Sequence, residues 1–315
     1  DGVDTSWDRI KPNDALKSYI KQAKDSFNID KPYQIIDYLS LAHRELNRVF
    51  DRDWRSIKKN EIKNLIKASS GLFFEALSNV ELASYGEEIK VKFDVINRSP
   101  YPMKLNKIQI NEKEFIIDDS LKNNKLFSIE KSFRLPLEHE VSEKYWLKNP
   151  SEFGSYNIND QKLIGEPDNK PVLEAKFIFK VNGQQISYIS PITYKLNSPI
   201  NGDEYRPFNI GNPIYLNPKN DLEYLVNTNK KQLEVEVISG SNDINARIYL
   251  DVPEGTKVDP EFYDINFKNK NEKKLLNFNV SLSGNKNSIN KISYKAKIGD
   301  KILSRGINKI IYSHI

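Results

Sequence analysis

Residues 88–95 read Glu-Ile-Lys-Val-Lys-Phe-Asp-Val, and here the chain changes its hydrophobic period. Apolar and charged residues alternate strictly in this stretch. Because successive side chains of a strand point to opposite sides, the alternation predicts a β-strand with one buried face. Upstream of residue 88 the apolar residues recur every three or four positions, which is typical of helices. The chain is therefore predicted to be of the α+β class, helical first and β afterwards.

The upstream part, residues 10–78, carries three helical patterns. The first follows Pro12-Asn-Asp14 and has its apolar residues at Leu16, Tyr19, Ile20, Ala23 and Phe27. The second, with Asp30 as an expected cap and Pro32 in its first turn, has them at Ile35, Leu39, Ala42, Leu46 and Val49. The third begins after Asp51 or Asp53 and has them at Ile62, Leu65, Ile66, Ser69, Leu72, Phe73 and Ala76. We expect a three-helix unit over residues 1–79.

Downstream of residue 88 the patterns are those of strands and turns. Further strands are expected at 107–117 and 126–135, and Asn182-Gly183 between alternating runs predicts a hairpin. The stretch 197–228, with four prolines, is expected to be an extended, irregular connector. Alternation returns at 233–237, 248–250 and 276–282, and a last hairpin, 292–298 with 301–311, turns at Gly299-Asp300. Residues 80–196 and 229–315 are each predicted to form an immunoglobulin-like β-sandwich.

The composition excludes several kinds of chemistry. The 315 residues include no cysteine, so disulfides and thiolate metal sites are excluded. The net charge is +5, and the densest basic segment, Lys268 to Lys274, is short and is interpreted as a turn rather than a nucleic-acid site. No apolar run is long enough for a membrane-spanning helix. The chain starts at Asp1 and not at Met, from which we expect it to be a piece of a longer protein.

No catalytic, cofactor-binding or metal-binding residue is predicted in this chain. The three histidines, His43, His139 and His314, do not have the spacing of a helical metal motif, and no phosphate-binding glycine motif is present. Glu138-His-Glu140 is interpreted as a solvated loop, with a cation site as the alternative. Asp118-Asp119 with Asn123-Asn124 is interpreted as turn material, with a calcium loop as the alternative.

One aromatic cluster is a candidate for binding. It consists of Phe133, Tyr145, Trp146 and Tyr156. Large rings beside leucine usually pack inward, which favours a structural role beneath a long loop. The alternative is a platform for a glycan or an interface with another protein.

Around this cluster the chain resembles a known family. Phe133-Arg-Leu-Pro136, Lys144-Tyr-Trp-Leu147, Gly154-Ser-Tyr156, 163–168 and 171–177 follow one another as in the C-terminal region of large LmbE/PIG-L-type deacetylases of Bacteroidetes. The motifs at 202–207 and 311–315 also fit that region. Near the start, the motifs at 4–9 and 68–76 are similar to the helical segment that follows the catalytic domain in those proteins.

The resemblance implies an accessory role. The family's members are zinc-dependent de-N-acetylases acting on N-acetylglucosamine-type groups, with a His-Pro-Asp-Asp-type motif in an N-terminal domain. This chain has no such motif, so zinc is expected only in a preceding domain, and none of the family's catalytic residues is carried over. The family's C-terminal part is similar to NEW3-type immunoglobulin-like domains. The implied partners are the chain's own catalytic domain and a glycan, with no nucleic acid, in a periplasmic or secreted protein.

Two other functions stay open. An independent carbohydrate-binding or adhesion module would expose aromatic rings such as Tyr145, Trp146 or Tyr156. A complete enzyme of an unfamiliar type would need a concave pocket with converging titratable groups, and the few histidines and missing motifs disfavour it.

Overall fold

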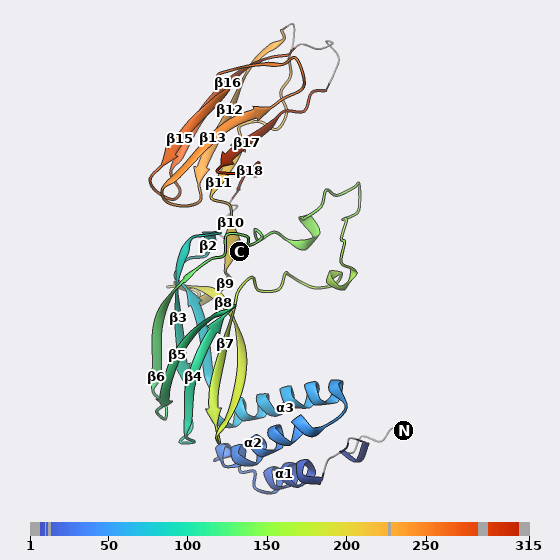
Figure 1. The fold of residues 1–315 in the computed structure, drawn as a ribbon, viewed down its shortest axis with the longest axis vertical. Coiled ribbons are helices and arrows are strands. Elements are labelled where there is room, and N and C mark those ends of the chain that lie inside the picture. The colour runs from blue at the N-terminus through green and yellow to red at the C-terminus, as the bar shows by residue number, and fades with distance from the viewer. Residues whose placement is uncertain (1–6, 10, 12–13, 226–227, 283–288, 309–315) are drawn as a thin grey trace. The chain divides into compact units, whose positions relative to one another are not determined.

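The computed structural model describes residues 7–9, 11, 14–225, 228–282 and 289–308. The chain divides into two compact units, each of which is described by itself (Figure 1). Unit 1 comprises Asp1–Glu81, Lys90–Phe133 and Asn169–Phe208. Unit 2 comprises Leu82–Ile89, Arg134–Asp168 and Asn209–Ile315. Helices at the N-terminus followed by sheets confirm the α+β class.

Unit 1 begins with three α-helices, as predicted. The helical elements are, in chain order, η1 Trp7–Arg9, α1 Asp14–Asp25, η2 Pro32–Ile35, α2 Ile36–Glu45, η3 Leu46–Arg48 and α3 Arg52–Ser70. Asp51 caps α3, because its side chain accepts a hydrogen bond of 2.9 Å from the backbone N–H of Trp54. The prediction for Asp30 is wrong, since Lys31 occupies the cap position of η2, with Pro32 in the first turn.

The third helix is shorter than predicted. It ends at Ser70, where Gly71 adopts the left-handed conformation with φ of 58° and closes the last turn. The next residues form strand β1, Phe73–Ser78, in which Phe74, Ala76 and Ser78 are buried and alternate with half-buried neighbours. The apolar residues assigned to the end of the helix therefore follow the period of a strand.

An eight-stranded sheet follows the helices. Its strands are β1, β3 Glu88–Ile96, β4 Met103–Ile110, β5 Lys113–Leu121, β6 Leu126–Arg134, β7 Glu174–Val181, β8 Gln184–Ser198 and β9 Gly202–Pro207. The order is β5-β4-β7-β8-β1-β3-β6, with β9 also paired to β8. The first half of β8 pairs with β7, and its second half pairs in parallel with β1 and antiparallel with β9. One long strand thus belongs to both parts of the sheet.

The strand predictions are confirmed in some places and wrong in others. The strand at 88–95 is β3, the strand at 126–135 is β6, and Asn182-Gly183, both with positive φ, joins β7 to β8 as expected. The single strand predicted at 107–117 is wrong, because the chain reverses at Asn111, whose φ is 49°. Asparagine tolerates this conformation better than most residues, so β4 and β5 form a hairpin there.

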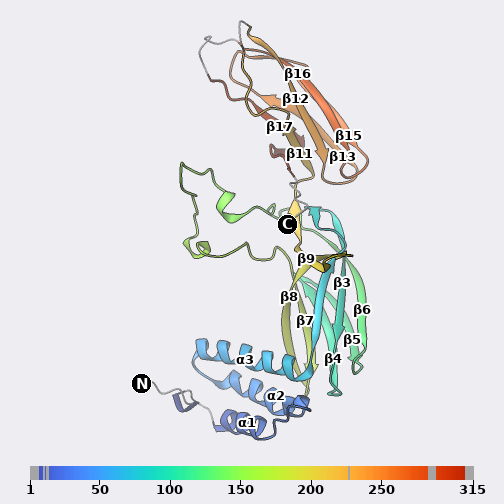
Figure 2. The ribbon, with the colours of Figure 1, turned by 180° about the vertical axis from the view of Figure 1, so that it is seen from behind.

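The core of unit 1 is aromatic, and the helices are joined to the sheet by hydrogen bonds. Phe177 is fully buried, with its ring centroid 5.0 Å from Phe74 and 5.9 Å from Phe93. The hydroxyl of Tyr188 donates to the carbonyl of Lys63 at 2.8 Å. The side-chain amide of Gln184 donates to the carbonyl of Ser40 at 2.8 Å, so α2 lies beside the β7–β8 turn (Figures 1 and 2).

Unit 2 contains two four-stranded sheets that pack face to face. Their strands are β11 Ile214–Pro218, β12 Lys230–Ser239, β16 Lys273–Ser281 and β14 Lys257–Asp259 in one sheet, and β15 Phe262–Phe267, β13 Ile244–Asp251, β17 Ser293–Ile298 and β18 Lys301–Leu303 in the other. Both sheets bury alternating residues, such as Val235, Val237, Ile248 and Phe278, in one shared core. A small parallel pair, β2 Leu82–Ser84 with β10 Asn209–Gly211, also belongs to this unit.

The connector predicted at 197–228 is not irregular throughout. It contains β9, β10 and β11. Pro207 and Pro218 are the last residues of β9 and β11, which lie at sheet edges. A proline is tolerated there, because its missing N–H faces no partner strand. Counting prolines therefore indicated an irregular connector where the chain has edge strands.

The last hairpin turns at Gly299-Asp300 as predicted, but β18 is only three residues long. Residues 304–308 then run along β11, and Leu216 donates its backbone N–H to the carbonyl of Arg305 at 3.0 Å. Positions 309–311 of the predicted strand, and His314, lie outside the described residues. Among the helices of the described ranges, none is both long and apolar enough to cross a lipid bilayer.

Candidate functional site

The candidate site is the loop of residues 134–168, which follows β6 and is drawn in green in Figure 1. It contains two short 3₁₀ turns, η4 Tyr145–Leu147 and η5 Gln161–Leu163. Loops of more than about 12–15 residues without extended secondary structure are uncommon inside compact domains and usually carry a function. We call this segment the finger loop.

The base of the finger loop is fixed to other parts of unit 2. Leu135 exchanges backbone hydrogen bonds with the segment 86–87, at 2.9 and 3.1 Å. Ser142 donates its backbone N–H to the carbonyl of Ile210 in β10 at 2.7 Å, and its hydroxyl accepts from the N–H of Ile210 at 2.8 Å. Lys301 donates to the carbonyl of Leu137 at 2.7 Å. The base is therefore held by backbone hydrogen bonds of Leu135 and Ser142, to which the side chains of Ser142 and Lys301 add one contact each.

The two arms of the finger loop are tied to each other above the base. The ammonium of Lys144 contacts both carboxylate oxygens of Asp168 at 2.6 Å. The hydroxyl of Tyr145 donates to the carbonyl of Glu166 at 3.0 Å. Lys148 donates to Glu140 at 2.8 Å, and this hydrogen bond lowers the pKa of the Glu140 carboxyl. The first two contacts join residues 24 and 21 positions apart, whereas Lys148 and Glu140 are 8 positions apart, so the first two fold the loop on itself.

The tip of the finger loop is a tight turn. Glu152 and Ser155 exchange two backbone hydrogen bonds of 3.2 Å, and Phe153-Gly154 occupy the corner. Gly154 has φ of 78°, which a type II turn requires at its second corner position and which glycine adopts without strain. Phe153 is fully exposed, at 109% of its reference area. A large apolar ring is thus held in water at the corner of a hydrogen-bonded turn.

The four aromatic residues predicted as a cluster lie in different environments. Phe133 is buried in β6 of unit 1, whereas the other three belong to the finger loop of unit 2. Tyr145 and Trp146 are half-buried and meet edge to face, with ring centroids 4.8 Å apart. Tyr156 is 59% exposed. Phe153 was not among the predicted residues, although Phe-Gly flanked by Glu152 and Ser155 is a recognisable turn signal.

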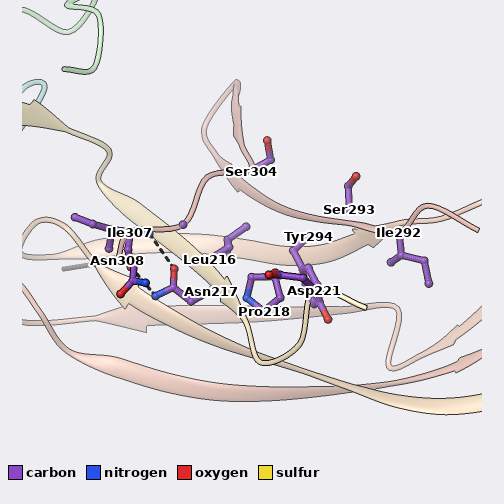
Figure 3. A pocket seen from close by; sticks show the side chains of 11 residues that line it. Leu216, Asn217, Pro218, Asp221, Ile292, Ser293, Tyr294, Ser304, Ile307 and Asn308 are labelled. Atoms are coloured by element: carbon purple, nitrogen blue, oxygen red, sulfur yellow. Dashed lines mark hydrogen bonds between the residues drawn. The ribbon is translucent and has the colours of Figure 1, made fainter. Parts of the chain in front are cut away.

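Unit 2 also contains a cleft of about 710 Å³ between β11 and β17 (Figure 3). Its lining is mixed: Leu216, Asn217, Pro218, Asp221, Ile292, Ser293, Tyr294, Ser304, Gly306, Ile307 and Asn308. Asn217 forms one wall, because its side chain both donates to and accepts from the backbone of Ile307 at 2.9 Å. Burial raises the pKa of the Tyr294 hydroxyl further above neutral pH, and the protonated hydroxyl can donate a hydrogen bond.

Asp118 and His139, from the two segments considered as cation sites, contact other groups of the protein. Asp118 lies in β5 and forms an ion pair with Lys104 at 2.8 Å. The calcium-loop alternative for Asp118-Asp119 with Asn123-Asn124 stays a prediction. The Nδ1 atom of His139 lies 3.0 Å from the carbonyl oxygen of Glu140. Within the described ranges no group of three or more His, Asp or Glu side chains is arranged to hold a metal ion.

Comparison with known proteins gives distant likenesses. The chain matches no protein-family model and no curated protein. Among solved structures it is similar to red sea bream transglutaminase (9% identity, TM-score 0.32, covering 81% of this chain and 34% of that one). It is also similar to the secreted serine protease VesC of Vibrio cholerae (9%, 0.25, 77% and 54%) and to Spo0M of Bacillus subtilis (9%, 0.26, 66% and 90%). The chain spans about a third of the length of the transglutaminase and about half the length of VesC. Likeness at this level carries no argument about function.

Proposed function

We propose that this chain is a non-catalytic accessory region that docks through the finger loop onto a catalytic domain of the same protein. The observation that carries the proposal is Phe153, fully exposed at the corner of a hydrogen-bonded turn. Burying a phenylalanine side chain gains about 1.5–3 kcal/mol. The hydrogen-bonded turn fixes the backbone at Phe153 in advance, so binding has mainly the rotamers of this side chain left to order.

Three further apolar or aromatic residues of the finger loop are exposed. Leu147, Tyr156 and Ile164 are 54%, 59% and 63% exposed. Protein interfaces concentrate their binding energy in a few aromatic anchors surrounded by weaker contacts. Phe153 has the properties of such an anchor, and the other three are suited to the surrounding contacts.

The proposed parent is a zinc-dependent de-N-acetylase of the LmbE/PIG-L type, in a periplasmic or secreted protein. The ordered motifs at 133–136, 144–147 and 154–156 support this parent. Zinc and the acid–base residues would be supplied by the domain before this chain, and no residue of the chain is assigned to them. We also propose that the sheets of both units are immunoglobulin-like, the second of the NEW3 type, which the face-to-face packing of antiparallel sheets in unit 2 supports.

The coding sequence upstream of Asp1 tests the parent. A His-Pro-Asp-Asp-type motif there is the expected result, and a secretion signal leading directly into Asp1 would overturn it. Docking is tested separately in the natural full-length protein by placing a photo-crosslinking phenylalanine analogue at position 153. We expect cross-links from position 153 to the catalytic domain.

The matched control places the same analogue at Ile200, which is 93% exposed at the β8–β9 turn of unit 1. Position 200 is expected to give no cross-link to the catalytic domain. Equal cross-linking from both positions, or none from position 153, would contradict docking through the finger loop.

A glycan-binding function is the second candidate, and the cleft between β11 and β17 is the observation that favours it. Asp221, Ser293 and Tyr294 present carboxylate and hydroxyl groups around about 710 Å³. Such groups can pair with sugar hydroxyls. Titration with N-acetylglucosamine oligomers should shift the NMR signals of these residues and not those of Phe153. Shifts spread evenly over unit 2 would contradict a site in the cleft.

A further inference from the structure

The face of α3 that lies toward α2 and the β7–β8 hairpin carries cations at every fourth position. Arg55, Lys59, Lys63 and Lys67 are spaced i, i+4, i+8 and i+12, so each is a neighbour of the next, and the row winds about a third of a turn around the helix from Arg55 to Lys67. Each step of four residues rises by about 6 Å along the helix axis, so the three steps from Arg55 to Lys67 cover about 18 Å. We call these four residues the cationic row.

Each side chain of the cationic row is half-buried rather than freely extended into water. Lys67 has its ammonium 4.3 Å from the centroid of the Phe74 ring, and Lys63 lies 5.6 Å from that of Tyr188. Arg55 donates to the carbonyl of Val49 at 3.1 Å. Rings and carbonyls thus hold the charges in place before any ligand arrives.

The charges that act on Lys59 and Lys63 are cations. Burial and Arg55 lower the pKa of Lys59, while burial, Lys176 of β7 and Lys59 lower the pKa of Lys63. His43 of α2 lies beside the row, and burial together with Lys59 and Lys63 lowers its pKa to about 4. The arrangement therefore gathers like charges, which by itself costs the fold stability.

Three acidic residues of α2 and α3 form their side-chain contacts with residues outside the cationic row. Glu61 pairs with Lys58 at 2.8 Å, and Glu45 pairs with Arg48 at 2.8 Å. Asp37 accepts a hydrogen bond of 2.6 Å from Tyr101. These neighbouring carboxylates do not neutralise the cationic row, so an external anion would find its charges available.

We propose that the cationic row, with Lys176, binds a linear acidic polysaccharide whose carboxylate or sulfate groups recur along one line. A single small anion would reach only one or two charges of a row about 18 Å long. Proteins that bind single-stranded nucleic acid add exposed rings for base stacking. The rings beneath Lys63 and Lys67, Tyr188 and Phe74, are 6% and 8% exposed, so they offer no stacking surface. This inference is independent of the docking of the finger loop.

The binding test uses the 315-residue chain with polygalacturonate and heparin as the acidic polymers, dextran as the neutral polymer, and a single-stranded oligodeoxynucleotide. The chain is expected to bind the acidic polymers at 50 mM salt, more weakly at 300 mM, and dextran not at all, since the contact is between charges. The double variant Lys59→Gln/Lys63→Gln is expected to lose at least about tenfold in affinity. Removing like charges should leave its melting temperature unchanged or higher, so a folded variant is expected.

The matched control is Lys122→Gln/Lys125→Gln, which removes the same charge from exposed positions between β5 and β6. It is expected to change affinity less than about twofold. Equal losses in the two double variants, tighter binding of the oligonucleotide than of either acidic polysaccharide, or no binding of either polysaccharide would overturn the proposal.

A spectroscopic readout locates the bound polymer. An anion on the cationic row would offset the charges of Lys59 and Lys63, so the pKa of His43 should rise from its low value when polygalacturonate is added. NMR titration of the His43 imidazole measures this shift, with His139 as the internal reference. Binding with no change at His43, or with an equal change at His139, would place the polymer elsewhere and overturn the proposal.

Discussion

Helix α3 and the finger loop both present side chains to solvent, but they hold them by different means. The backbone of α3 is fixed by its own hydrogen bonds and by burying Ile62 and Ile66 on one face. The finger loop has no comparable buried face and is held by contacts such as Lys144–Asp168 and the paired backbone bonds of Glu152 and Ser155. A change in α3 should therefore be felt by unit 1 as a whole, whereas a change in the loop should be felt locally.

The largest expected effect is that of removing a buried side chain from α3. Ile66→Ala empties a site that is 0% exposed, and we expect the free energy of unfolding to fall by about 2–5 kcal/mol. Leu65→Ala, at a neighbouring position that is 50% exposed, should change it by less than about 0.5 kcal/mol. Urea unfolding followed by helical circular dichroism measures both. Similar losses in the two variants would mean that α3 does not pack as described.

A smaller effect is expected from pH at the same helix. Because the pKa of His43 is lowered from 6.5 to about 4, the unfolded chain binds a proton between these values that the folded chain does not bind. The free energy of unfolding should thus fall as the pH drops from 6.5 to 4. The His43 contribution should be about 1–2 kcal/mol, reduced from the full shift because the side chain is only half-buried.

The variant His43→Gln isolates this contribution. Urea unfolding of both proteins at pH 7 and at pH 4.5 should show a smaller pH dependence in the variant. If the two proteins lose the same stability on acidification, the lowered pKa of His43 is not a property of the fold.

In the finger loop the expected change is local. Gly154→Ala places a Cβ on a residue with φ of 78°, which should favour opening of the tip turn by about 1 kcal/mol. Amide exchange at Ser155 and cleavage by proteases near Phe153 should accelerate, while the urea midpoint stays unchanged. Ser155→Ala is the control, since only the backbone of Ser155 joins the turn. A shifted midpoint in Gly154→Ala would show that the tip is coupled to the rest of the unit.

The smallest effect is expected from the tie between the two arms. Lys144 and Asp168 are both nearly half-exposed, so Lys144→Gln should cost less than about 1 kcal/mol. The variant should show faster amide exchange in residues 163–168. Adding salt to the wild-type protein should accelerate exchange in these residues to a similar extent. Tyr145→Phe removes the hydrogen bond to Glu166 instead, and its effect should not depend on salt. Identical salt responses in the two variants would contradict the ion pair as a tie.

The sequence predicted the elements whose residues alternate or repeat without interruption. Strand β3 and the Asn182-Gly183 turn are examples, because their burial pattern and turn conformation follow from local residue types. The end of α3 could not be placed in this way. Phe73 and Ala76 fit a helical spacing as well as a strand, and only the pairing of β1 with β3 decides between them.

The parts of the candidate site also differed in whether a local sequence pattern could predict them. The turn at Phe153-Gly154 is local and could have been recognised, whereas the contact of Lys144 with Asp168 joins positions far apart in the chain. The cationic row was visible as a spacing of four along the third helix. Its neighbours His43 and Lys176 are brought to it by the packing of α2 and β7, which no local pattern contains.

Strand β8 also has a consequence for the order in which unit 1 can fold. Its second half pairs in parallel with β1, joining Ala76 to Ile192 across more than a hundred residues. Such distant pairing carries a large loop-closure cost and slows folding. During synthesis β1 leaves the ribosome long before β8, so one edge of β1 stays unpaired while β3 to β7 are made. The nascent chain should therefore be most prone to aggregation, and most dependent on chaperones, until residues 192–194 have emerged.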